Sequence, residues 1–252
     1  MTDNKLDFLI NCLLTERGEK IKIPESEHDK FRLYRSLVNV RPAAPASDEY
    51  YAAENALLTE LTANKGITDI AELTPREPHI YLWHGDITTL KCGAIVNAAN
   101  SGMTGCYHPC HNCIDNCIHT FAGIRLREKC DEIMRAQGHE EPTGAAKITP
   151  AYNLPCEYVI HTVGPIVQGQ LTDEHCGLLE RCYKSCLDIA VQNGLKSIAF
   201  CCISTGVFGF PPDEAAQIAV NTVRDYLKTH DIEVIFNVFT KTDFDIYNRL
   251  LG

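Results

Sequence analysis

Short runs of almost uninterrupted apolar residues constrain the fold of this chain more than any other feature. Runs of this kind fit strands that are covered by helices on both faces. The expected strands are 80–84, 94–97, 158–163, 197–203 and 233–239. Longer amphipathic segments separate these runs, and the helices expected there are 115–137, 174–193, 213–230 and 243–250. The chain is therefore predicted to be an α/β protein: a three-layer α/β/α sandwich with a mixed, mostly parallel sheet.

The N-terminal part of the chain has a different texture, because its apolar residues recur at helical spacing. Two prolines in the segment 41–47 interrupt the pattern, after which Ser47 can cap the next helix. Alternation of short and long apolar segments begins after Pro75. We therefore predict a helical N-terminal extension over residues 1–75 and the α/β sandwich over residues 76–252.

Charge and hydropathy restrict the partners and the location of the protein. Lys plus Arg total 23 against 33 for Asp plus Glu, which gives a formal net charge of −10 and argues against nucleic acid as a main partner. No segment approaches the roughly 18 consecutive apolar residues of a membrane helix, and the N-terminus lacks the pattern of a secretory leader. We therefore expect a cytoplasmic protein without a membrane span, and a monomer as the default state.

Ligands of such sheets bind beyond the carboxyl ends of the strands, so the loops 85–88, 98–113 and 204–212 are the candidate binding segments. Gly206 and Gly209 allow a tight turn whose backbone N–H groups face an anion. No Gly-Lys-Ser/Thr follows, so a diphosphate fits better than a nucleoside triphosphate. The alternative interpretations are a structural turn at 204–212 and, at 85–88, a turn whose aspartate satisfies local amides.

The middle loop predicts a metal site. Residues 106–119 hold four Cys and three His, the donor types that Zn²⁺ prefers. Cys110 and Cys113 have the spacing of a zinc knuckle, and Cys106, His108 and His111 could complete the set. No second pair lies at zinc-finger distance, which favours three protein ligands and an open fourth position. The alternative is a set of reduced cysteines that line the loop. By contrast, His161 lies inside an expected strand and is interpreted as a hydrogen-bonded core residue.

Five segments in one order resemble the macrodomains of the MacroD type. They are GDIT at 85–88, AIVNAAN at 94–100, TGAAKIT at 143–149, YVIHTVGP at 158–165 and STGVFG at 204–209. The resemblance covers the chain from about residue 79 onward. Together with the helical extension and the cysteine-rich loop, it is closest to the zinc-containing macrodomains of microbes. This family binds ADP-ribose, and members of this branch remove mono-ADP-ribose from proteins.

The resemblance also implies roles for individual residues. Asp86 and Ile87 match the pair that contacts the adenine, and Phe239 matches an aromatic that stacks on it. The expected diphosphate cradle is the backbone of Ser204, Thr205, Gly206, Val207 and Phe208, and Phe208 would also pack on the distal ribose. Asn97 and Asn100 lie in the same motif and are both expected to bind the substrate, and Asn100 matches the asparagine that hydrogen-bonds the distal ribose. Asp115 matches the catalytic aspartate, so Asp115 and Asn100 are the expected catalytic residues.

Between Asn100 and Asp115 the family usually has a short run of glycines, whereas this chain has a longer cysteine- and histidine-rich loop. Resemblance to the zinc branch places the ligands of one Zn²⁺ on Cys106, His111 and Cys113. His108 and Cys110 lie in the same loop and keep other assignments open. The metal would either bind a ribose hydroxyl or activate water, and we favour an orienting Lewis acid with Asp115 polarising the water.

These expectations lead to three functional hypotheses. The first is a zinc-dependent hydrolase that cleaves the glycosidic bond between ADP-ribose and a protein side chain. The alternatives are a reader module that binds ADP-ribose without turnover, and a hydrolase of O-acyl-ADP-ribose or ADP-ribose phosphate. An aspartate paired with an open metal site favours the first, because a reader needs neither. The resemblance further implies a functional link to a sirtuin-type ADP-ribosyltransferase.

Overall fold

The computed structural model describes residues 2–252, with side chains from residue 5 onward. Its centre is a six-stranded sheet with the strand order β2-β8-β7-β4-β6-β5. The strands are β2 (Ile80–His84), β4 (Ala94–Ala99), β5 (Ala146–Pro150), β6 (Tyr158–Val163), β7 (Ser197–Phe200) and β8 (Glu233–Val238). Only the pairing of β5 with β6 is antiparallel. The sheet is therefore mixed and mostly parallel, as predicted.

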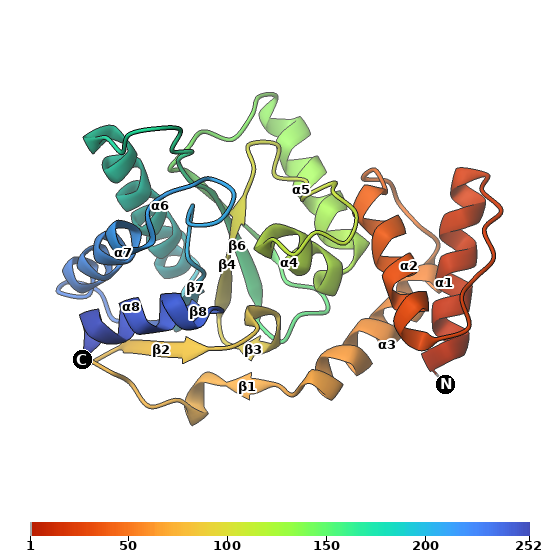
Figure 1. Cartoon of the computed structure of the whole chain (residues 1–252), viewed down its shortest axis with the longest axis horizontal. Helices are drawn as coiled ribbons and strands as arrows, with labels where there is room; N and C mark the ends of the chain where they lie inside the picture. Colours follow the sequence, from red (N-terminus) through yellow and green to blue (C-terminus); the bar gives the residue numbers. More distant parts are fainter. Residues whose placement is uncertain (1) are drawn as a thin grey trace.

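Helices cover both faces of the sheet (Figure 1). They are α4 (Ile114–Ala122), α5 (Ile124–Gln137), α6 (Asp173–Gln192), α7 (Pro212–Tyr226) and α8 (Lys241–Leu251). Figure 1 shows α4 and α5 on one side of the sheet, with α6 and α7 on the other. Because helices cover both faces, the central strands β4 and β7 are buried along nearly their whole length and are mostly apolar. The predicted three-layer sandwich is confirmed.

The structure corrects several details of the predicted elements. The helix expected over 115–137 is broken at Gly123, whose φ of 91° separates α4 from α5. The strand expected over 197–203 ends at Phe200: residues 201 and 202 lie outside it, and a turn begins at residue 203. Strand β5 was not expected, since it lies at the sheet edge and its residues are mostly half-buried, which leaves no continuous apolar run.

The N-terminal helices lie beside α4 and α5 (Figure 1). They are α1 (Thr2–Arg17), α2 (Glu27–Val40) and α3 (Asp48–Lys65). The predicted cap is confirmed, because the Ser47 side chain accepts a hydrogen bond from the backbone N–H of Tyr50. Residues 66–75 were expected to belong to the helical extension, but they contain no α-helix. They contain β1 (Thr68–Asp69) and the short 3-10 helix η1 (Ile70–Glu72).

A single cluster of buried apolar side chains extends from Leu6 in α1, through the sheet, to Leu251 in α8. The N-terminal helices thus share the core of the sandwich, and a division of the chain at residue 75 stays a prediction. None of the helices within residues 2–252 has the length and apolar character that crossing a bilayer requires.

Candidate active site and metal centre

The loop that follows β4 returns to the end of that strand and brings the two predicted catalytic residues together. Asp115 lies in the first turn of α4, where the helix dipole favours a carboxylate. Its Oδ1 accepts a hydrogen bond from Asn97 Nδ2 at 2.8 Å, and its Oδ2 lies 3.4 Å from Asn100 Nδ2. Asn100 also donates to the carbonyl of Gly105 at 3.1 Å. Two amides therefore fix the orientation of the carboxylate.

The environment of Asp115 changes its acidity. Burial raises the pKa of this carboxyl to about 6, while the hydrogen bond from Asn97 and the charge of Arg127 oppose the rise. Arg127, on α5, donates to the carbonyl of Thr104 at 2.7 Å and lies 4.4 Å from the ring centroid of Tyr107. It was not predicted from the sequence, because nothing local marks one arginine of an amphipathic helix as buried.

Asn97 is not placed as expected for a substrate-binding residue. Its side chain is 0% exposed and lies behind Asp115 rather than at the surface. Its Nδ2 also lies 3.1 Å from His161 Nδ1, and His161 Nε2 lies 3.0 Å from Thr149 Oγ1. Burial lowers the pKa of His161 to about 3, which keeps the ring neutral. The interpretation of His161 as a core histidine is confirmed, and Asn97 holds the aspartate in place.

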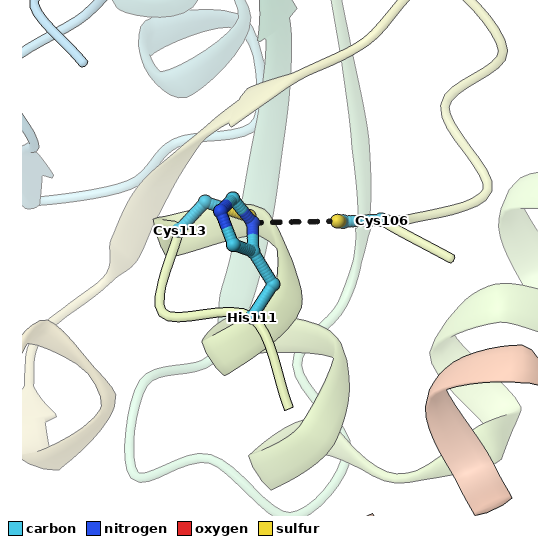
Figure 2. Close-up of side chains that lie close together, drawn as sticks. All are labelled: Cys106, His111 and Cys113. Carbon is cyan, nitrogen blue, oxygen red and sulfur yellow. Dashed lines mark hydrogen bonds between the residues drawn. The ribbon is translucent and has the colours of Figure 1, made fainter. Parts of the chain in front are cut away.

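The three predicted metal ligands lie together at the N-terminus of α4 (Figure 2). The ligand atoms of Cys106, His111 and Cys113 are all within 4.8 Å of one another. Cys106 Sγ lies 3.6 Å from His111 Nδ1, which agrees with the roughly 3.5 Å between donors in a tetrahedral site with bonds of about 2.0–2.3 Å. Two thiols and an imidazole are a donor set that suits Zn²⁺.

The alternative ligands are placed differently. Cys110 Sγ is directed to the carbonyl of Arg32 at 3.4 Å, on α2. His108 packs its ring edge-on against His111 with 5.3 Å between ring centroids. Neither belongs to the cluster of donors in the described residues. The arrangement therefore fits a zinc ion on Cys106, His111 and Cys113.

The other predicted binding residues lie at the same edge of the sheet. The N–H of Gly85 donates to the carbonyl of Val238 at 3.1 Å, so Asp86 and Phe239 follow adjacent strand ends. Phe239 is 74% exposed and Val207 is 79% exposed, so both side chains are accessible to a ligand. Ser204 has a φ of 66° at the start of the 204–208 loop, which follows β7.

The carboxylate of Asp86 already has several partners within the protein. Its Oδ1 accepts hydrogen bonds from the N–H and the hydroxyl of Thr88, and so caps the 3-10 helix η2 (Ile87–Thr89). Its Oδ2 forms a 2.8 Å ion pair with Lys65 at the end of α3. Ile87 is 1% exposed as a whole residue, so the accessible part of this segment is at Gly85 and Asp86, which are half-buried. The turn interpretation of the segment agrees with these contacts, and binding of the adenine by Asp86 and Ile87 stays a prediction.

A model of the Macro domain family matches residues 96–219 of the chain. A protein-ADP-ribose hydrolase of Treponema medium is 56% identical over 97% of this chain and 97% of its own length. Another from Staphylococcus aureus (strain MSSA476) is 51% identical over 97% of this chain and 94% of its own length. Among solved structures, the Trypanosoma brucei macrodomain in complex with ADP-ribose has a TM-score of 0.67 at 30% identity, and covers 91% of this chain and 97% of that one.

The Oceanobacillus iheyensis macrodomain with MES bound has a TM-score of 0.63 at 38% identity, and covers 68% of this chain and 89% of that one. The match to the trypanosome structure covers 91% of this chain, which is more than residues 76–252 alone make up. The similarity therefore extends into the N-terminal part. The sandwich and its strand-end site define a macrodomain. The chain belongs to the macrodomain family, and its near full-length similarity to curated hydrolases shows that it is a hydrolase.

Proposed function

We propose that this hydrolase is a zinc-dependent protein mono-ADP-ribosylhydrolase, which cleaves the glycosidic bond between ADP-ribose and a modified protein side chain. The observation that carries the proposal is the position of Asp115. Its carboxylate is held by Asn97 and Asn100. In the sequence, Asp115 follows two residues after Cys113, a member of the cluster of two thiols and an imidazole. A pure reader of ADP-ribose needs neither an oriented carboxylate nor a metal site.

The strand-end loops match the parts of ADP-ribose. In this proposal the backbone at Asp86 and Ile87 contacts the adenine, and the exposed ring of Phe239 stacks on it. The backbone of residues 204–208 receives the diphosphate, because N–H groups in a tight turn stabilise an anion. The proposal is supported by the trypanosome neighbour, whose structure is a complex with ADP-ribose.

The chain's own residues position the reactants. Asn100 forms a hydrogen bond with the distal ribose, and Asp115 orients the attacking water and accepts its proton. The bond between C1″ and the protein side chain breaks as the water oxygen bonds to C1″. The hydroxyl stays on C1″, and the proton that Asp115 accepted goes to the leaving side chain. Cys106, His111 and Cys113 would hold a Zn²⁺, which would supply Lewis acidity to the reaction.

The decisive experiment measures the release of ADP-ribose from an auto-modified protein by native enzyme, chelated enzyme and an Asp115→Ala variant. We expect the native enzyme to release ADP-ribose far faster than the chelated enzyme or the variant. The rate in the variant should be lower by about 10²–10⁴-fold. Equal release in all three would show that neither zinc nor Asp115 takes part. Binding of ADP-ribose without any release would favour a reader, and turnover of O-acyl-ADP-ribose alone would favour the small-molecule hydrolase.

The metal is tested separately by elemental analysis. We expect about one zinc per chain, and loss of the metal in a Cys113→Ser variant. Full zinc retention in a double variant, Cys106→Ser with Cys113→Ser, would instead move the ligands to His108, Cys110 and His111.

We also propose a reducing location and a partner. All 13 cysteines are free thiols, and a thiol cluster retains its metal-binding form in the cytoplasm. The proposed functional partner is a sirtuin-type ADP-ribosyltransferase that attaches the group removed here. The proposed monomer is checked by light scattering during size-exclusion chromatography, where a mass near twice 28.1 kDa would contradict it.

A further inference from the structure

The cysteine-rich loop is held by α2 of the N-terminal extension. Arg35 on α2 donates through Nη2 to the carbonyl of His111 at 2.7 Å and to Asn116 Oδ1 at 2.9 Å. The first contact fixes the main chain of one proposed ligand. His111 and Asn116 follow Arg35 by 76 and 81 positions in the sequence. The contacts therefore exist only because α2 packs beside α4 (Figure 1).

Asn116 collects the loop around one buried side chain. It is 0% exposed, and its Nδ2 donates to the carbonyl of His108 at 3.0 Å and to the carbonyl of Cys106 at 3.3 Å. Its backbone N–H lies 3.4 Å from Cys113 Sγ. One residue thus touches two of the three proposed ligands directly. Arg35 orients the Asn116 amide by donating to its Oδ1, which also lies 3.5 Å from the Thr120 hydroxyl.

Asn39 holds the remaining part of the loop. This buried residue of α2 accepts a hydrogen bond from the N–H of Cys110 at 2.9 Å, while its Nδ2 donates to Thr120 on α4 at 3.1 Å. Cys110 has a φ of 54°, a conformation that a side chain disfavours and that persists only where neighbours enforce it. The hydrogen bond that the Cys110 N–H donates to Asn39 Oδ1 is such a constraint.

We propose that Arg35 and Asn39 are positioning residues of the metal centre: acting directly and through Asn116, they hold the loop 106–113 in the conformation that binds zinc. The proposal rests on the zinc site of the proposed function. A loop already ordered by α2 loses little conformational entropy when the metal binds, and so retains the metal longer. The N-terminal helices are accordingly part of the site.

The test uses full-length protein loaded with Zn²⁺ and measures transfer of the metal to a chromogenic chelator. Arg35→Ala and Asn39→Ala are expected to release zinc about 10–100-fold faster, the usual effect of losing a group that orients a ligand. The matched control is Arg32→Ala, one turn away on α2. The Arg32 side chain is exposed, and the hydrogen bond between Arg32 and the loop is made by its backbone carbonyl, which the variant keeps. Release from the control should equal that of the native protein.

A second readout distinguishes positioning from general destabilisation. In metal-free protein, Asn39→Ala should speed amide hydrogen exchange at Cys110 and leave exchange in α6 unchanged. If an alanine variant does not fold, Arg35→Lys and Asn39→Ser carry the same test with smaller expected effects. Native protein that binds no zinc would overturn the proposed metal site. Native protein that binds zinc, with all α2 variants releasing it at the native rate, would overturn this inference alone.

Discussion

At Gly105 the loop after β4 lies directly against the ring of His119. Gly105 has a φ of 89°, and a Cβ at this position would lie 2.9 Å from His119 Cγ. His119 is itself buried, one helical turn after Asp115, with its Nε2 at 3.6 Å from Asp115 Oδ1. The loop can therefore approach the helix of Asp115 this closely only because residue 105 has no side chain.

We expect Gly105→Ala to destabilise the protein more than Gly138→Ala. Gly138 also has a positive φ, of 77°, but nothing lies within 4 Å of a Cβ there. The Gly138 change should cost about 1 kcal/mol for the unfavourable backbone alone, and the Gly105 change at least about twice that. Urea unfolding of both variants in chelator measures the difference. Equal losses would show that the His119 ring gives way.

Phe239 supplies a prediction about ligand binding. Its ring is exposed at the end of β8, beside the turn that contains Asp86. Phe239→Ala should weaken ADP-ribose binding by about 1–3 kcal/mol if the ring stacks on the base. Calorimetric titration measures this, and Phe244→Ala on α8 is a control aromatic. Unchanged affinity in Phe239→Ala would remove the stacking assignment.

At the scale of elements, Glu54 joins three helices. It lies in α3, is 0% exposed, and accepts hydrogen bonds from the Tyr34 hydroxyl of α2 at 2.7 Å and the Ile124 N–H of α5 at 3.0 Å. Burial raises the pKa of this carboxyl to about 7, and the two hydrogen bonds offset part of the rise. Residue 123 has to be a glycine, because a Cβ at that position would lie 2.6 Å from Glu54 Oε2.

Glu54 should make stability fall as the pH rises. Its pKa is higher in the folded state than the usual 4.5, so between about pH 4.5 and 7 the folded state binds more protons than the unfolded state. The contribution is fully present below about pH 4.5 and is lost as the pH passes about 7, with a limit of about 3 kcal/mol.

Urea unfolding from pH 5 to pH 8 checks this, with Glu54→Gln as the comparison. The difference in unfolding free energy between native protein and variant should decline with pH. A difference that is flat, or that grows, would show that the carboxyl is charged throughout this range.

At the scale of the whole molecule, the shared core predicts cooperative unfolding. The buried cluster joins Leu57 of α3 to Ile118 of α4 and to the sheet, so the N-terminal helices cannot separate without exposing apolar surface. Far-UV circular dichroism, which reports all helices, and fluorescence of the single tryptophan, Trp83 in β2, should give one coincident thermal transition. An earlier loss of helical signal would show that residues 1–75 unfold as a separate unit.

Local patterns in the sequence were enough to predict much of the sandwich. A strand buried on both faces must be apolar throughout, so 158–163 is predicted with its observed bounds. The edge strand 80–84 is only partly buried, but its mostly apolar run also predicts the observed bounds. The strand-end rule for parallel sheets likewise predicts which loops meet, and the density of thiols and imidazoles marks the segment that holds Cys106, His111 and Cys113. Each of these signals lies within one short segment.

Tertiary packing decided the rest. That Asn97 lies behind Asp115, that Lys65 occupies Asp86, and that Arg35 reaches the carbonyl of His111 are contacts between elements far apart in the chain. An amphipathic pattern says which face of α2 is apolar but not which loop its polar side chains will meet. Hydrogen bonds of this kind are set by how helices pack on a common core, so only the folded structure identifies the residues that hold the site together.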